Sequence, residues 1–234
     1  MNKPIAIITG ASTGIGRSLS IKLSDKYFIY LVARDKNKLD KVASEIFKNK
    51  NECQVIQADI SKTESMDLIY SQIDRKQDIE LLINNAGMAL FEDISNLSIE
   101  DWDKQLNVNL RGSFLMTKMV VDDFKVQKKG TIVFINSVAG LYPYKNSTAY
   151  AASKHGLKGF ASSLREELRV DNIKVVSVFP GAIDTPLWDG MGMVDLKPEM
   201  MNVNDAGDMI VNAIDSPNNC VVEEMIIRRV EGDF

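Results

Sequence analysis

Tyr150 and Lys154 have the residue types and the spacing needed for shared acid–base chemistry. They form a Tyr-x-x-x-Lys motif in a segment expected to be helical, and residues four apart lie on the same helix face. A phenol has a reference pKa of about 10, and a nearby ammonium group lowers it by favouring the phenolate. Tyr150 is therefore predicted to act as a general acid/base, which contributes about 10²–10⁴ in rate.

Ser137 strengthens this interpretation, because a Tyr-x-x-x-Lys match alone can arise by chance. It comes thirteen residues before Tyr150 and directly follows an expected strand, residues 130–136. Ligands bind at the carboxyl ends of parallel strands, and a serine hydroxyl there can hydrogen-bond a substrate oxygen. We therefore expect Ser137, Tyr150 and Lys154 to form one catalytic group.

A glycine-rich turn near the start of the chain has the features of a phosphate-binding loop. It lies between an expected strand, residues 4–9, and an expected helix, residues 15–25. Glycine lets a dinucleotide pyrophosphate approach bare backbone, and the helix N-terminus supplies N–H groups and a positive dipole end. The turn predicts a dinucleotide cofactor that contacts Gly10, Ser12, Gly14, Ile15 and Gly16.

The same turn also fits the Gly-x-Ser-x-Gly pattern of a hydrolase nucleophile. Ser12 would then be the nucleophile and His155, the one histidine of the chain, its base. In hydrolases of that kind, an oxyanion loop and several strands precede the nucleophile, whereas only nine residues precede Gly10. The hydrolase interpretation is therefore disfavoured. One histidine also excludes zinc sites built on several histidines, and no metal is expected.

Short β-branched runs alternate with longer amphipathic segments along the chain. The strands are expected at residues 4–9, 28–32, 54–57, 79–84, 130–136, 173–179 and 221–227, and the helices at 15–25, 35–48, 61–73, 98–124, 147–170 and 205–214. Asp35 is expected to cap the second helix, and Ser61 to open the third in a capping box with Glu64. The alternation implies right-handed crossovers. The predicted fold class is α/β, a Rossmann-type doubly wound, mainly parallel sheet in a single domain, residues 1–234.

One long irregular stretch, residues 181–204, interrupts the alternation. Loops of this length are uncommon unless they are functional or disordered, so it is interpreted as a substrate loop. Apolar side chains there and in two other segments are expected to line a pocket for a hydrophobic ketone, aldehyde or alcohol. They are Leu187, Trp188, Met191, Met193, Val194, Met88, Leu90, Tyr142 and Tyr144.

The composition is that of an ordinary globular protein. Of the 234 residues, 45% are hydrophobic and 26% are charged, and the formal net charge is −4. A mildly acidic chain has no electrostatic footprint for nucleic acid. No apolar run approaches a membrane span, and the N-terminus lacks signal-peptide features. A cytoplasmic protein with no nucleic-acid or membrane partner is expected, with Cys53 and Cys220 as reduced core residues.

Several short motifs, in order and spacing, make the sequence resemble the short-chain dehydrogenase/reductase family over nearly its whole length. They are Thr9-Gly10-x-x-x-Gly14-x-Gly16, Asn84-Asn85-Ala86-Gly87, Val108-Asn109-Leu110, Ser137, Tyr150-x-x-x-Lys154 and Pro180-Gly181. The resemblance implies an NAD(P)-dependent oxidoreductase that passes a hydride between nicotinamide and a carbonyl or alcohol. It also implies a homodimer or homotetramer. A nicotinamide-binding sensor or scaffold with little turnover is the alternative, but the complete motif set favours catalysis.

The resemblance further implies a role for each matching residue. Tyr150 would be the acid in reduction and the base in oxidation, and Lys154 would also hold the nicotinamide ribose. Ser137 would orient the substrate oxygen, and Asn109 would anchor a water in a proton relay. The remaining cofactor contacts would come from Asp59 at the adenine, from Asn85 and Gly87, and from Pro180, Gly181, Ile183 and Thr185 beside the nicotinamide.

The end of the second strand bears on the choice between NAD and NADP. NAD enzymes place a carboxylate there for the ribose 2′-hydroxyl, whereas NADP enzymes place an arginine nearby for the 2′-phosphate. In this chain Ala33 is uncharged, Arg34 follows it, and Asp35 is interpreted as a helix cap. NADP is therefore the expected cofactor. NAD remains the alternative, because Thr13, just before the second glycine, is not basic.

Overall fold

The sheet is built from the β-branched and aliphatic runs of the chain. The computed structural model describes residues 3–189 and 194–232. Within them, seven parallel strands pair in the order β3-β2-β1-β4-β5-β6-β7. Their bounds are β1 Ile5–Thr9, β2 Phe28–Ala33, β3 Cys53–Gln57, β4 Ile79–Asn84, β5 Gly130–Ile135, β6 Ile173–Pro180 and β7 Glu224–Ile227. The predicted Rossmann-type, single-domain fold is confirmed.

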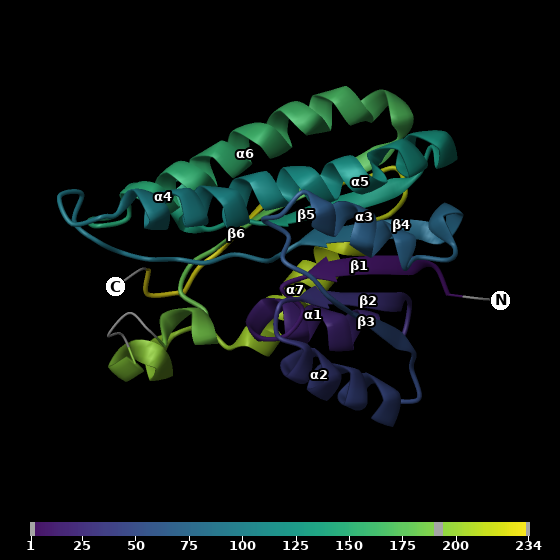
Figure 1. The fold of residues 1–234 in the computed structure, drawn as a ribbon, viewed down its shortest axis with the longest axis horizontal. Coiled ribbons are helices and arrows are strands. Elements are labelled where there is room, and N and C mark those ends of the chain that lie inside the picture. The colour runs from purple at the N-terminus through teal and green to yellow at the C-terminus, as the bar shows by residue number, and fades with distance from the viewer. Residues whose placement is uncertain (1–2, 190–193, 233–234) are drawn as a thin grey trace.

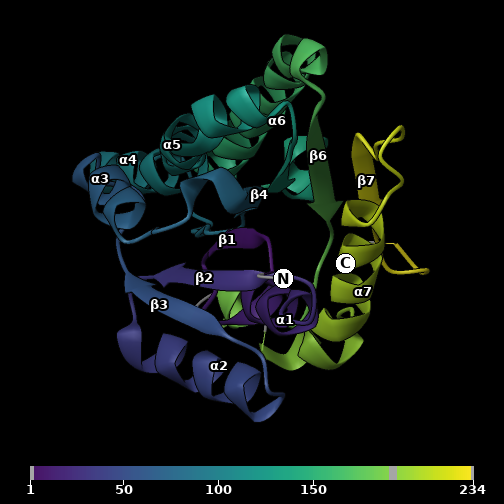
Figure 2. The same ribbon diagram turned by 90° about the vertical axis from the view of Figure 1, so that its right-hand side faces the viewer.

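Helices cover both faces of this sheet, as Figures 1 and 2 show. They are α1 Gly14–Leu23, α2 Lys36–Lys48, α3 Glu64–Ser71, α4 Ile99–Leu106, α5 Gly112–Gln127, α6 Thr148–Leu168 and α7 Val203–Ile214. One core cluster packs α3, α5 and α6 on the sheet, and another packs α1, α2 and α7 on its other face. Alternate strand residues serve the two clusters: Ile5 and Ile7 face the first, whereas Ala6 and Ile8 face the second. This is the period of two expected of a strand.

The strand order reverses between β1 and β4, which lie side by side although β2 and β3 intervene in the sequence. Ligands of open α/β sheets bind outside the carboxyl ends of the strands at such a switch point. The glycine turn follows β1, and Asn85 follows β4. The topology therefore brings these two motifs to one crevice.

The structure corrects several predicted boundaries. The expected capping box is wrong: the Ser61 backbone N–H and hydroxyl both donate to Asp59, and the N-cap of α3 is Thr63. Asp35 does cap α2, because its carboxylate accepts from the backbone N–H of Lys38 at 3.1 Å. The helix expected at 98–124 consists of α4, a π-helical segment Asn107–Arg111, and α5.

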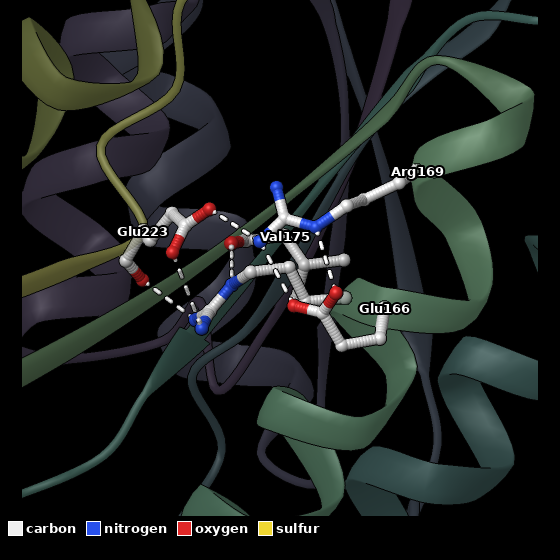
Figure 3. A network of polar contacts seen from close by, with 5 residues as sticks. Glu166, Arg169, Val175 and Glu223 are labelled. Atoms are coloured by element: carbon white, nitrogen blue, oxygen red, sulfur yellow. Dashed lines mark hydrogen bonds and ion pairs between the residues drawn. The ribbon is translucent and has the colours of Figure 1, made fainter.

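A buried arginine fastens the edge strand β7 to the rest of the sheet. Arg165 of α6 donates from Nε to the carbonyl oxygen of Val175 at 3.1 Å and from a terminal nitrogen to that of Glu223 at 2.8 Å. The Glu223 carboxylate also pairs with Arg169, which in turn binds Glu166 (Figure 3). The residue before β7 is thus held by the C-terminal end of α6.

Among the described residues, no helix combines the length and the apolar character needed to cross a bilayer.

Candidate active site

β5 and α6 bring the three predicted catalytic side chains together. Ser137 follows β5, and its hydroxyl forms a hydrogen bond with Tyr150, which is 7% exposed. Lys154 is 5% exposed and donates from Nζ to the carbonyl oxygen of Ile135 at 3.0 Å. The same Nζ lies 5.6 Å from the centre of the Tyr150 ring. All three residues line one cavity.

Burial is the main cause of the pKa shifts of both Tyr150 and Lys154. It raises the pKa of the Tyr150 phenol, and the hydrogen bond with Ser137 offsets part of that rise. Burial also lowers the pKa of the Lys154 ammonium to about 8. The sequence predicted that the ammonium would lower the pKa of Tyr150, and this is wrong here because desolvation dominates. A protonated phenol near neutral pH is suited to donating a proton.

Asn136, which lines the cavity, and Ser153, which does not, hold the backbone of this group in position. The Asn136 amide donates to the carbonyl oxygen of Lys154 at 3.1 Å, and its own oxygen accepts from the Ser137 N–H at 2.9 Å. Ser153 donates to the carbonyl oxygen of Tyr150 at 2.7 Å. Asn136 was not predicted as a site residue, although its place directly after β5 was a usable signal.

Asn109 lies behind the catalytic group and not in the wall of the cavity. It is buried in the π-helical segment, where its oxygen accepts from the Met88 N–H at 2.8 Å. Its amide nitrogen donates to the carbonyl oxygen of Met88 and to the Ser153 hydroxyl, both at 2.9 Å. The side chain therefore ties the loop after β4 to α6. The water-relay role remains a prediction.

The glycine turn has the close backbone approaches that a dinucleotide requires. Gly10 and Gly14 have φ angles of 63° and 54°, which disfavour other residues. A Cβ at Gly16 would lie 2.3 Å from the carbonyl oxygen of Gly10, so glycine lets the start of α1 approach the turn closely. Gly16 does not line the cavity. The Asn85 amide donates to the carbonyl oxygens of Thr9 and Gly10 at 2.9 and 3.1 Å. It holds the turn in shape.

A cavity of about 1040 Å³ runs from this turn to the catalytic group. That volume fits the upper range of ligand and cofactor pockets. Of the predicted cofactor residues, the following line it: Gly10, Ser12, Gly14, Ile15, Arg34, Asp59, Asn85, Gly87, Tyr150, Lys154, Pro180, Gly181, Ile183 and Thr185. The residues present therefore fit an extended dinucleotide.

Two cations stand at the end of β2, where the sequence predicted one. Arg34 and Lys38 both line the cavity, and both are exposed. Asp35 also lines it, but its carboxylate caps α2 and lies 3.7 Å from the Lys38 ammonium. Lys38 was missed because it lies on the first turn of a helix, four residues after Arg34.

The other end of the cavity is apolar and aromatic. Met88, Tyr144, Leu187 and Trp188 line it as predicted. Leu90 and Tyr142 do not line it: the Leu90 side chain is exposed, and the Tyr142 ring lies 5.5 Å from the guanidinium carbon of Arg228. Met191 and Met193 lie outside the described residues, as does the side chain of Val194. Phe91, which was not predicted from the sequence, also lines this end of the cavity.

The structure separates the two residues of the disfavoured hydrolase interpretation. Ser12 lines the cavity, whereas His155 is exposed on α6 and its Nδ1 lies 3.0 Å from the carbonyl oxygen of Ala151. Among the residues that the structure describes, no cluster of three or more His, Cys, Asp and Glu residues could hold a metal ion.

Comparisons with known proteins agree with this geometry. Residues 4–192 match the short chain dehydrogenase family. The sepiapterin reductase of Chlorobaculum tepidum is 34% identical, with 99% of this chain and 98% of that protein covered. A metagenomic short-chain oxidoreductase solved with NADP has a TM-score of 0.85 at 28% identity, covering 98% of each chain. A short-chain dehydrogenase from Sphingobium yanoikuyae solved with NADPH has a TM-score of 0.86 at 28% identity, covering 95% and 87%.

Proposed function

Because the chain belongs to the short-chain dehydrogenase family and is an oxidoreductase of that family, we propose that it reduces a hydrophobic ketone or aldehyde with NADPH. The observation that carries the proposal is a single cavity with the glycine turn at one end and Ser137, Tyr150 and Lys154 at the other. An apolar wall adjoins the catalytic group, and this wall suits an uncharged, hydrophobic carbonyl compound. Lys145 also lines the cavity, next to Tyr144.

In this proposal, Ser137 and Tyr150 hold the carbonyl oxygen by hydrogen bonds. NADPH, when bound, supplies a hydride to the carbonyl carbon. Tyr150 donates its proton to the oxygen as negative charge develops there, and the product is an alcohol. Because burial raises the pKa of Tyr150, the phenol holds at neutral pH the proton that reduction requires. The Lys154 ammonium donates its remaining hydrogen bonds to the hydroxyls of the nicotinamide ribose.

The preference for NADP over NAD rests on Arg34 and Lys38. Both cations line the nucleotide end of the cavity, and Arg34 has a planar fork suited to a 2′-phosphate. The carboxylate that would serve a ribose 2′-hydroxyl, that of Asp35, is engaged in capping α2. Two of the solved relatives hold NADP or NADPH.

The other site residues keep the roles given by the family resemblance. In this proposal Asp59 contacts the adenine, Asn85 and Gly87 flank the cofactor, and Asn109 anchors a water in a proton relay. Residues 181–204 act as the substrate loop. We also infer a homodimer or homotetramer, supported by the exposed Phe114 of α5 and by Gly159 of α6, which faces open space. Light scattering after size-exclusion chromatography measures this assembly.

The test is a panel of ketones and aldehydes incubated with NADPH or NADH, with loss of reduced nicotinamide and formation of alcohol both measured. The expected result is equal amounts of NADPH consumed and alcohol formed, with apolar carbonyls preferred. Binding of NADPH without turnover of any carbonyl would favour the alternative function, a nicotinamide-binding sensor or scaffold.

A further inference from the structure

The loop that joins β4 to α4 is anchored at every second residue. Asn109 binds the backbone N–H and carbonyl of Met88. The Leu90 N–H donates to Oε1 of Gln105 at 3.0 Å, and the Glu92 N–H donates to the carbonyl oxygen of Asn146 at 2.7 Å. Between these anchors, the loop turns Ala89 and Phe91 into the cavity.

Among these anchors, Gln105 has a polar amide that packing alone does not explain. It lies on α4, is fully buried, and does not line the cavity. Its Nε2 has no hydrogen-bond partner among the described residues. Burying an unpaired amide group is unfavourable, so an apolar residue of similar size would suit simple packing better. The bond from its Oε1 to Leu90 accounts for a glutamine at this position.

Phe91 directly follows the residue that Gln105 anchors. Its ring centroid lies 5.8 Å from that of Tyr150 with an interplanar angle of 69°, and 6.4 Å from that of Trp188 with an angle of 65°. Trp188 is itself fixed, because its indole nitrogen donates to the carbonyl oxygen of Ile183 at 2.9 Å. Phe91 and Trp188 form what we call the aromatic wall, which adjoins the Tyr150 ring through Phe91.

The edge-to-face geometry of this wall indicates what it binds best. Aromatic rings prefer offset or edge-to-face partners, and such contacts add to the affinity beyond the area that they bury. A flat ring held next to Tyr150 meets two aromatic partners, whereas a puckered ring of the same size meets them only as apolar surface. The preference depends on the orientation of Phe91 and therefore on the loop.

We propose that Gln105 is a positioning residue that selects substrates whose carbonyl is attached to a flat aromatic ring. By holding the Leu90 N–H, Gln105 fixes Phe91 in the aromatic wall. The inference rests on the proposed carbonyl reduction and narrows its substrate class. Among the described residues, no hydrogen bond joins the Gln105 side chain to Ser137, Tyr150 or Lys154, so its effect is proposed to reach the substrate through Phe91.

The test compares acetophenone with cyclohexyl methyl ketone, which differ in the flatness of the ring but little in size. Gln105→Leu removes the acceptor for Leu90. We expect the KM for acetophenone to rise by roughly three- to tenfold with little change in kcat, because an edge-to-face contact is worth about that factor. The KM for cyclohexyl methyl ketone should change by less than about twofold, so the preference for the flat ring falls.

Two further variants separate positioning from a general loss of structure. Gln127→Leu is the matched control, because Gln127 also carries a buried Nε2 without a partner among the described residues but does not line the cavity. It should leave the preference unchanged. Gln105→Glu, assayed at about pH 6 where burial favours the neutral carboxyl, restores an acceptor for Leu90 and should restore the preference.

A double-mutant cycle between Gln105 and Phe91 distinguishes positioning of the ring from a purely structural role of Gln105. Phe91→Leu removes the ring directly and should reduce the preference as much as Gln105→Leu does. The double variant should show no further loss, because both substitutions act on one contact. Additive losses, or an equal effect of Gln105→Leu on both ketones, would overturn the proposal.

Calorimetry with acetophenone distinguishes failure of this inference from failure of the proposed function. If the wild type binds acetophenone without reducing it, the proposed reduction fails. The inference then stands only if Gln105→Leu weakens that binding and Gln127→Leu does not. If the wild type does not prefer acetophenone to cyclohexyl methyl ketone in binding or in turnover, the aromatic wall does not select flat rings and the inference is overturned.

Discussion

Helix α6 carries two buried cations, and the contrast between them separates chemistry from stability. Lys154 and Arg165 are 5% and 7% exposed and lie eleven residues apart, about three turns. Arg165 has two carbonyl oxygens as hydrogen-bond partners, and the Glu223 carboxylate lies 3.8 Å away. Among the described residues Lys154 has one partner, the carbonyl oxygen of Ile135, although an ammonium carries three donors.

A buried cation with unused donors is unfavourable unless a ligand takes them. Lys154 faces the cavity, and burial lowers its pKa to about 8. Arg165 faces the edge of the sheet, where its partners belong to β6 and to the residue before β7. Under the proposed function, the contrast indicates that the first half of α6 serves catalysis at the expense of stability. The second half holds the last strand in place (Figure 3).

Tyr150→Phe should have the largest effect, because it removes the proton donor and leaves the ring in place. We expect turnover to fall by at least about 10²-fold while NADPH affinity and the unfolding transition change little. Tyr142→Phe is the matched control, since Tyr142 is exposed and does not line the cavity. Retention of more than a tenth of the wild-type rate by Tyr150→Phe would remove the acid–base role.

Lys154→Met should move activity and stability in opposite directions. We expect roughly a 10²-fold loss of turnover and weaker NADPH binding. We also expect a gain of about 1–2 kcal/mol in the free energy of unfolding at pH 7, since a buried, poorly paired ammonium is removed. Steady-state kinetics and urea denaturation measure the two effects.

The gain in stability should disappear as the pH rises. The pKa of Lys154 falls from 10.5 to about 8 on folding, so between these values the unfolded chain binds more protons and wild-type stability rises with pH. Above about pH 10 the wild type and Lys154→Met should therefore differ little in urea denaturation. A gain that stays constant from pH 7 to about pH 10 would show that the ammonium is not its source.

Arg165→Met should have the opposite effects to Lys154→Met: a loss of stability with little change in turnover. It leaves the carbonyl oxygens of Val175 and Glu223 without their donor, which should reduce the free energy of unfolding by about 2–3 kcal/mol. Turnover per folded molecule should stay within about twofold of wild type, because Arg165 does not line the cavity. A large loss of kcat in fully folded protein would contradict the proposal that the second half of α6 serves stability and not catalysis.

Arg34→Ala should have the smallest effect, because Arg34 is exposed and its interactions are screened by water and salt. We expect NADPH affinity to fall by about tenfold and NADH affinity to stay constant, with the loss shrinking at high salt. Lys36→Ala is the control, because Lys36 pairs with Asp40 and does not line the cavity. Equal losses for both cofactors would exclude a role at the 2′-phosphate.

Features encoded by neighbours in the sequence were predictable, and those made by distant segments were not. The glycine turn, Ser137 and the Tyr150–Lys154 pair are set by local spacing on strands and helices, so the sequence placed them in one site. The aromatic wall joins Phe91 to Trp188, almost a hundred residues later, and Phe91 sits in an irregular loop without periodicity. No local pattern indicates such a contact.

The errors have the same origin. The direction of the Tyr150 pKa depends on how deeply the fold buries it, which spacing does not reveal. Ser61 matched a capping pattern, but tertiary structure gave it Asp59 as a partner. Gln105 was passed over because a glutamine on an amphipathic helix is usually at the surface, and only the packing of α4 shows it buried against the Leu90 backbone.

Isotope transfer tests the central claim most directly: that a hydride passes straight from nicotinamide to a carbonyl carbon held at Ser137 and Tyr150. NADPH carrying deuterium at both C4 positions of the nicotinamide ring would be incubated with protein and a reducible ketone, and the alcohol analysed by mass spectrometry and NMR. The account predicts one deuterium per product molecule, on the carbinol carbon. Alcohol without deuterium, or with deuterium elsewhere, would contradict it.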